Sequence, residues 1–233
     1  MFRVFIIGFL LFFNLYGIDS DALKAFKNKE YAKAFELYEK SAQDGDSASQ
    51  SALSYLYANG LGVEKDTKKS IFWLEKAADG FNASAQYDIG MMYLDGYNVE
   101  QNKTKALNYL SKSSKLNNPN AKFNLALMYY KGDAVDINAT KTAELLESAA
   151  LQGHKEAIKN VGRLYMQILK FDKASKWLEI NAKDGDKEAY YLLAEIYCEQ
   201  SKFKQAKKWA KKSMEDGNPK ASALYEKYKL NKY

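Results

Sequence analysis

An internal repeat constrains the fold of this chain more than any other feature. Similar segments that read as the end of an amphipathic helix recur as YEKSAQDG (38–45), WLEKAADG (73–80), LESAALQG (146–153), WLEINAKDG (177–185) and WAKKSMEDG (209–217). With one Asn in place of Gly, the residues that end these repeats are Gly45, Gly80, Asn117, Gly153, Gly185 and Gly217, spaced 35, 37, 36, 32 and 32 apart. Glycine and then asparagine best tolerate the left-handed conformation that ends a helix. A period of this length is typical of helical-hairpin arrays.

Each repeat contains two helical patterns. In the first, small and large residues recur on one face, as in Ala85/Ile89/Gly90/Tyr93, Leu53/Ser54/Tyr57, Leu125/Ala126/Tyr129, Val161/Gly162/Tyr165 and Leu193/Ala194/Tyr197. The second has small, large and small residues at i, i+3 and i+7, as in Ala34/Leu37/Ser41, Ser70/Trp73/Ala77, Ala106/Tyr109/Ser113, Ala143/Leu146/Ala150, Ala174/Trp177/Asn181 and Ala206/Trp209/Ser213. One hairpin cannot bury such faces, but stacked neighbours can, so we predict an all-α superhelical solenoid of antiparallel hairpins.

The N-terminal residues differ from the rest. MFRVFIIGFLLFFNLYG has one basic residue, Arg3, followed by an apolar run from Val4 to Phe13. This run is shorter than the roughly 20 residues that span a bilayer. The pattern predicts a signal peptide over 1–17 and a periplasmic or secreted protein, with an uncleaved anchor as the alternative. The predicted units are 18–45, 46–80, 81–117, 118–153, 154–185, 186–217 and a capping helix over 218–233.

These residues resemble a known repeat family. The pattern A-x-Q-x-x-x-L-G-x-x-Y, a loop such as NGLGVEKD (59–66) and a second helix that ends in KAADG are similar to the Sel1-like repeat, a relative of the tetratricopeptide repeat. The resemblance implies a right-handed solenoid over nearly the whole mature chain. The opening unit and the two that end at Gly185 and Gly217 have short turns closer to the tetratricopeptide form. Secreted Sel1 proteins often carry a cysteine pair in each repeat, whereas this chain has Cys198 alone.

The resemblance also implies that the first helix of each repeat lines the concave side. The residues expected there are Tyr55, Tyr87, Met91, Leu94, Phe123, Leu127, Tyr130, Lys159, Arg163, Met166, Tyr191 and Glu195. A strip of aromatic and methionine side chains with a few charges is typical of a surface that binds a peptide or protein. The alternative is that single members only complete the packing between adjacent first helices.

Two loops carry a candidate modification motif. Glu100-Gln-Asn-Lys-Thr104 and Asp136-Ile-Asn-Ala-Thr140 both contain Asn-x-Thr with an acidic residue two positions before the asparagine. This pattern resembles the extended acceptor of bacterial periplasmic N-glycosylation. We therefore predict glycan at Asn102 and Asn138. The alternative is that both asparagines only cap the helices that follow.

Positive charge gathers near the C-terminus. The chain has a formal net charge of +6, and residues from Ser201 onward include ten lysines and three acidic residues. Lys207, Lys208, Lys211 and Lys212 share one side of a predicted helix, which could contact a membrane surface, peptidoglycan or an acidic partner. A solvated outer face of the last repeat is the alternative. No nucleic-acid motif is present, so no nucleic-acid partner is expected.

The sequence does not indicate an active site. Ser201-Lys-Phe-Lys204 matches S-x-x-K, but the Ser-Asp-Asn and Lys-Thr-Gly motifs that would complete such a site are missing. With one histidine, His154, and one cysteine, the sequence argues against His- and Cys-based metal sites and catalytic triads. We therefore expect no enzymatic activity, cofactor or metal, and a scaffold that binds a peptide or protein partner of the cell envelope. The alternative is an envelope factor that binds peptidoglycan or weakly binds or hydrolyses β-lactams, as some cysteine-rich Sel1 proteins do.

Overall fold

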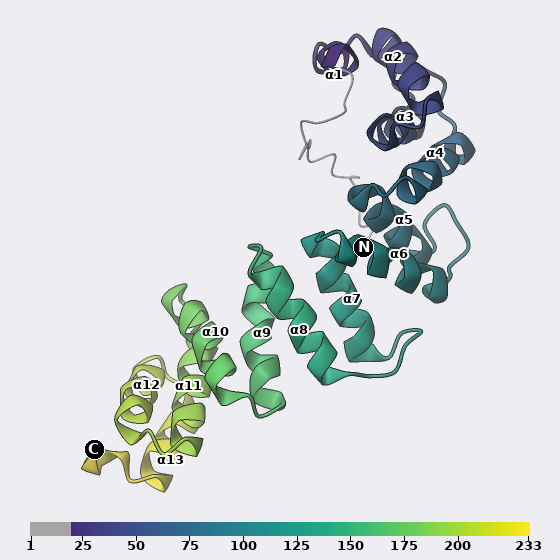
Figure 1. Ribbon diagram of the computed structural model, residues 1–233. Coiled ribbons are helices and arrows are strands. Elements are labelled where there is room, and N and C mark those ends of the chain that lie inside the picture. The colour runs from purple at the N-terminus through teal and green to yellow at the C-terminus, as the bar shows by residue number, and fades with distance from the viewer. Residues whose placement is uncertain (1–19) are drawn as a thin grey trace. The chain divides into compact units, whose positions relative to one another are not determined.

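The computed structural model describes residues 20–233, and this part of the chain is helical without a strand. The predicted signal peptide over 1–17 lies outside the described residues. The α-helices are α1 (Ser20–Lys27), α2 (Tyr31–Gln43), α3 (Ser47–Asn59), α4 (Thr67–Asp79), α5 (Ala83–Asp95), α6 (Lys103–Lys115), α7 (Pro119–Lys131), α8 (Ala139–Ala150), α9 (Lys155–Gln167), α10 (Phe171–Lys183), α11 (Lys187–Glu199), α12 (Phe203–Glu215) and α13 (Pro219–Lys227), followed by the short 3₁₀ helix η1 (Leu230–Lys232) (Figure 1). The predicted all-α repeat solenoid is confirmed.

The helices form two compact units, one that runs to Leu125 and one over Ala126–Tyr233. In the first unit, each helix from α1 to α6 packs against the next one in sequence. The second unit repeats this order from α8 to α13. Because the contacts join sequence neighbours, the hydrophobic core of each unit is a series of interfaces between consecutive helices.

Polar side chains set the starts of the helices. Asp46, Asp66, Asn82 and Asn102 precede α3 to α6, and the side-chain oxygen of each accepts a hydrogen bond from the backbone N–H three residues later, at 2.7–3.0 Å. Each bond satisfies one of the N–H groups that the first turn of a helix leaves without a partner. The loops before α3 to α6 therefore fix where these four helices begin, whereas α2, α10 and α12 start without a side-chain cap.

A left-handed residue follows each of the second helices α2, α4, α6, α8, α10 and α12, but after α4 it is not the predicted glycine. Gly45, Asn117, Gly153, Gly185 and Gly217 all have positive φ, between 65° and 97°, as predicted. Gly80 was expected to do the same, but its φ is −77°, and the next residue, Phe81, is left-handed at 60°. A β-carbon at Gly80 would lie 2.8 Å from Cβ of Ser47. Gly80 therefore allows the end of α4 to approach the start of α3.

Small residues on the first helices allow the second helices to pack closely, as predicted. A β-carbon at Gly90 would lie 3.0 Å from Cγ of Leu110, and one at Gly162 would lie 2.9 Å from Cγ of Leu178. Both leucines are fully buried. They lie one position after the large residues that the periodicity had placed on this face, Tyr109 and Trp177. Tyr109 stays partly exposed, because the leucine faces the glycine instead.

Polar bonds also join one repeat to the next. Tyr93 Oη donates to Glu75 at 2.8 Å, and Tyr165 Oη donates to Glu147 at 2.7 Å. Tyr197 Oη donates to Glu179 at 2.7 Å, and burial together with this carboxylate raises the pKa of Tyr197 to about 12. The tyrosine belongs to a first helix and the glutamate to the second helix of the preceding repeat, so each bond fixes the stacking of two hairpins.

The glutamine of the A-x-Q pattern also joins each of its repeats to the preceding helix by a hydrogen bond. Gln50 Nε2 donates to the backbone oxygen of Ala42 at 3.1 Å, and Gln86 Nε2 donates to that of Ala78 at 2.9 Å. Both side chains are buried, and they satisfy carbonyl groups in the last turn of the preceding helix. The glutamine thus connects consecutive repeats.

The C-terminal helix is shorter than the capping helix expected over 218–233. α13 ends at Lys227, and Lys229 is left-handed with φ 51°. The chain then turns, so that Leu230 is buried and the Tyr233 ring stacks on Phe203 with centroids 4.7 Å apart. Lys207 Nζ donates to the backbone oxygen of Asn231 at 3.2 Å. The last residues therefore fold back over α12 to complete the cap.

The contact between Gly162 and Leu178 gives a test of this packing. We expect Gly162→Ala to lower the free energy of unfolding by about 1 kcal/mol, because overpacking costs about 1–3 kcal/mol and outweighs the gain in helix propensity. The loss should shrink in a Leu178→Ala background, since the clashing methyl groups are gone. Urea unfolding of the four proteins in the double-mutant cycle measures the coupling. Equal losses in both backgrounds would contradict the close packing.

Candidate functional site

In the first unit, the predicted binding residues are Tyr55 on α3, Tyr87 and Met91 on α5, and Phe123 on α7. All four are partly exposed, whereas Ala85 and Ile89 on the same turns of α5 are fully buried. Tyr87 Oη accepts a weak hydrogen bond from Asn124 Nδ2 at 3.4 Å. This bond joins α5 to the next first helix, α7. Large side chains thus stay accessible outside the core, on consecutive first helices.

Tyr55 has a second role. Its ring meets the Phe26 ring of α1 edge-on, with centroids 6.0 Å apart. Such an aromatic pair contributes about 0.5–1.5 kcal/mol beyond the area it buries. One side of Tyr55 therefore packs on α1, and its side chain as a whole is partly exposed.

The sequence pattern does not single out Asp88, an acidic residue on α5 in this region. Burial raises the pKa of the Asp88 carboxyl to about 7. Within the described residues, its side chain has no hydrogen bond or ion pair to offset the loss of solvent. Burial and the nearby Asp88 charge also raise the pKa of Tyr87. An acidic group with a pKa near neutral can change its charge when a partner arrives.

In the second unit, the predicted residues are Leu127 and Tyr130 on α7, Arg163 on α9 and Tyr191 on α11. Tyr130 is the most exposed of them, at 53%. Leu127 and Tyr191 are partly exposed, and burial, then the charge of Glu195, raises the pKa of Tyr191. These side chains extend the set of accessible apolar groups on the first helices.

Arg163 already has partners within the protein. Its Nη2 atom donates to Asp186 at 2.7 Å and to Glu188 at 2.9 Å, at the start of α11. Burial disfavours the guanidinium charge, but these carboxylates outweigh it and raise the pKa of Arg163. Arg163 therefore ties α9 to α11, and its positive charge is more than offset by the two carboxylates.

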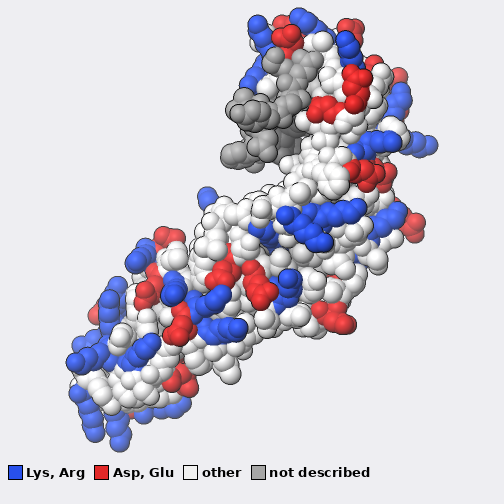
Figure 2. Space-filling view, in the orientation of Figure 1, with Lys and Arg blue, Asp and Glu red and all other residues white. Residues whose placement is uncertain are grey.

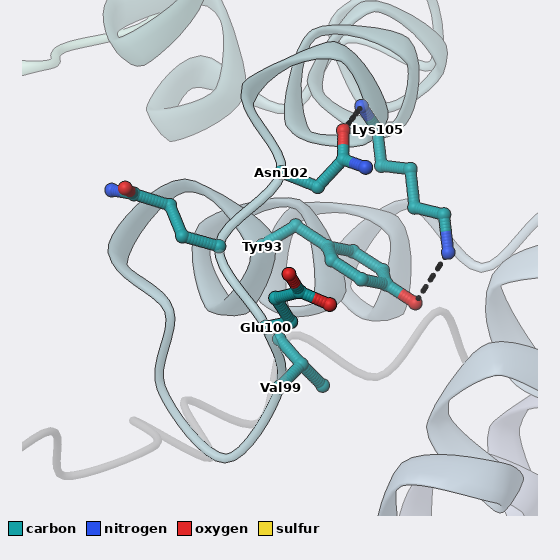
Figure 3. Close-up of a pocket in the computed structure, with 6 residues that line it drawn as sticks. Tyr93, Val99, Glu100, Asn102 and Lys105 are labelled. Carbon is teal, nitrogen blue, oxygen red and sulfur yellow. Dashed lines mark hydrogen bonds between the residues drawn. The ribbon is translucent and has the colours of Figure 1, made fainter.

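The predicted glycosylation residues lie at corresponding helix starts. Asn102 Oδ1 accepts from the backbone N–H of Lys105 at 2.9 Å, and Asn138 Oδ1 accepts from that of Lys141 at 2.8 Å. Both asparagine side chains are exposed. Around Asn102, the loop borders an open hollow of about 390 Å³, whose walls also include Tyr93 and Lys105 (Figure 3). The capping role is thus present, and it involves only the amide oxygen.

The lysine-rich helix α12 has a partly structural role. Figure 2 shows basic side chains gathered where α12 and α13 end the chain. Lys208 and Lys212 lie over the Trp209 ring at 5.2 and 5.1 Å from its centroid, and Lys212 also lies over Tyr190. Lys211 is exposed. The ammonium groups of Lys208 and Lys212 thus interact with aromatic faces of the last repeats, which gives these two lysines a role in packing.

Cys198, His154 and Ser201 are the residues that the sequence offered for catalysis or metal binding. Cys198 is buried, and burial raises the pKa of its thiol to about 11, so that it stays protonated. His154 caps α9 by accepting from the Ala157 N–H through Nδ1, and burial lowers its pKa. Ser201 lies in the turn before α12 with φ 56°. Among residues 20–233, no cluster of three His, Cys, Asp or Glu side chains could bind a metal ion, and no helix is both long and apolar enough to cross a bilayer.

The fold and its accessible first-helix side chains define a helical-repeat protein. The chain belongs to the Sel1 repeat family, which matches residues 5–46, 47–80, 83–118, 119–154 and 187–218. The repeat over 155–186, with its short turn, lies outside these matches. No curated protein matches the sequence.

Solved structures support the same fold. The chain is similar to a Sel1 repeat protein from Oxalobacter formigenes, with 27% identity and a TM-score of 0.63, over 86% of this chain and 83% of the other. It is also similar to c5321, a protective antigen of uropathogenic Escherichia coli with an SLR fold, with 28% identity and a TM-score of 0.63 over 84% of this chain. That match spans 45% of the c5321 chain.

The raised pKa of the Asp88 carboxyl predicts a pH-dependent stability. Its folded pKa of about 7 lies above the ordinary value of 3.8, so the folded state holds the proton more tightly than the unfolded state. The carboxyl therefore destabilises the fold increasingly as pH rises from about 4 to 7. We expect Asp88→Asn to raise the melting temperature at pH 8 and to change it little at pH 4. Thermal melts followed by circular dichroism measure this difference.

Asp95→Asn is the matched control, because it removes an exposed carboxyl from the same helix. A melting-temperature difference between Asp88→Asn and wild type that stays constant from pH 4 to pH 8 would contradict the raised pKa of Asp88.

Proposed function

We propose that this protein is a non-enzymatic scaffold of the bacterial cell envelope that binds an extended peptide or a protein partner along the first helices of its repeats. Sel1 repeats generally mediate protein–protein interactions and are generally non-catalytic. The location in the envelope rests on the hydrophobic N-terminal segment of the sequence. Cell fractionation of the full chain tests that location independently of any partner.

The contrast between the faces of the first helices is the observation that carries this proposal. On α5, Ala85 and Ile89 have no exposed surface, while Tyr87 and Met91 keep part of theirs. Phe123 repeats this behaviour on α7. Accessible aromatic side chains, held by helices whose other face is fixed in a core, supply large contact areas at low cost in conformational entropy, and the flexible methionine adapts to the shape of a partner.

Asp88 and Arg163 indicate the chemistry of the partner. In the first unit, a lysine or arginine side chain brought near Asp88 would stabilise the ionised carboxylate. In the second unit, Arg163 is already paired with Asp186 and Glu188. The proposed partner segment for the first unit therefore carries apolar side chains beside a basic one.

A set of double variants tests the proposed binding. Tyr87→Ala/Phe123→Ala affects the first unit and Tyr130→Ala/Tyr191→Ala the second. Because loss of one binding hot spot costs about 1.4 kcal/mol or more, we expect recovery of a specific partner to fall at least about tenfold in one or both variants. The measurement is a crosslinked pull-down from the envelope, quantified by mass spectrometry.

Phe72→Ala/Phe81→Ala is the control, because both rings are exposed outside the predicted strip. Circular dichroism must show that all variants remain folded. Recovery of the same proteins by every variant would contradict binding through the first helices. Recovery of peptidoglycan fragments without a protein would instead favour the peptidoglycan-binding alternative.

A further inference from the structure

Helix capping uses only the side-chain oxygen of Asn102 and Asn138 and leaves the side-chain nitrogen of each amide. In each, the oxygen caps the following helix, while Nδ2 has no hydrogen-bond partner within the described residues. Figure 3 shows the hydrogen bond from the Lys105 backbone to the side-chain oxygen of Asn102. Both side chains are exposed, so the nitrogen is accessible to a large modifying enzyme.

A third loop shows that the fold does not require this nitrogen. Asp66 stands at the corresponding position before α4, and its carboxylate accepts from the Lys69 N–H at 2.9 Å. An oxygen acceptor alone is therefore sufficient to start the second helix of a repeat. The amides at positions 102 and 138 are free to serve another purpose.

The residues around both asparagines form the rest of an acceptor motif. Thr104 and Thr140 complete Asn-x-Thr, the recognised acceptor of N-linked glycosylation. Glu100 and Asp136 precede the asparagines by two residues. All four of these side chains are exposed. The same set of groups thus occurs at equivalent surface positions in two repeats.

Asn82 provides an internal comparison. Asn82-Ala-Ser84 also satisfies Asn-x-Ser, but Gly80 stands two residues before it. The Asn82 side chain is partly buried, and its Nδ2 donates to the backbone oxygen of Ser47 at 3.4 Å. Its nitrogen is therefore engaged within the fold.

We propose that Asn102 and Asn138 are N-glycosylated and that Asn82 is not. The donor is an oligosaccharide linked to a lipid pyrophosphate, and the catalyst is an asparagine oligosaccharyltransferase. The amide nitrogen bonds to the anomeric carbon, the bond from that carbon to the phosphate oxygen breaks, and the lipid pyrophosphate leaves with the electron pair. The amide proton passes to a base of the transferase, so the step involves no oxidation or reduction. The inference rests on the proposed location in the envelope.

The test uses the full chain in two bacterial strains that differ only in such a transferase. Intact mass spectrometry of the periplasmic fraction should show two equal mass increments in the transferase strain and none in the other. Asn102→Asp and Asn138→Asp should each remove one increment, because Asp keeps the cap and lacks the acceptor nitrogen. The double variant should carry none, and Asn82→Asp should keep both. Glu100→Gln should reduce occupancy at Asn102 alone.

A chain with a C-terminal copy of Glu-Gln-Asn-Lys-Thr is the positive control. Modification of this tag while Asn102 and Asn138 stay unmodified would overturn the proposal. Equal modification of Asn82 would contradict our inference that exposure and the acidic residue two positions earlier decide which asparagine is glycosylated. Absence of the chain from the periplasmic fraction would instead contradict the proposed location. This outcome differs from a chain that reaches the periplasm but stays unmodified at Asn102 and Asn138.

Discussion

Every hairpin of this protein depends on its neighbours to bury its apolar faces. The close approach of consecutive helices makes that burial possible: Leu110 fills the space left by Gly90, and Leu178 fills that left by Gly162. Since packing between carbon atoms weakens steeply with distance, a small residue at these crossings determines how tightly two helices associate. In these two hairpins, the orientation of the first helix against the second follows from this contact.

Polar bonds give the stacking its register. Tyr93 to Glu75, Tyr165 to Glu147 and Tyr197 to Glu179 repeat the same bond between a first helix and the preceding second helix. Apolar packing alone tolerates small slips, whereas a hydrogen bond of 2.7–2.8 Å to a carboxylate does not. The bonds therefore hold the partly exposed faces of successive first helices in a regular order.

The sequence predicted the features that periodicity controls. The order of the helices and the left-handed residue at Asn117 could be inferred, because the repeat length and the residue types at helix ends reflect local physics. The backbone conformation of Gly80 could not be inferred, since the role of this residue is a contact with Ser47, which lies 33 residues earlier in the chain. The end of α13 at Lys227 was missed for a similar reason: Leu230 is buried by the returning chain, and helical periodicity does not show such a turn.

The candidate site was only partly predictable. The positions of Tyr87 and Phe123 follow from the repeat register, but the raised pKa of Asp88 and the pairing of Arg163 with α11 depend on how neighbouring helices pack.

The central claim is that the partly exposed aromatic and methionine side chains of the first helices form a recognition surface. The most direct measurement places a photo-crosslinking amino acid at Met91 on α5 or at Phe72 on α4 in living cells. Our account predicts a discrete protein adduct from position 91 and none from position 72, and equal adducts from both, or an adduct from position 72 alone, would contradict it.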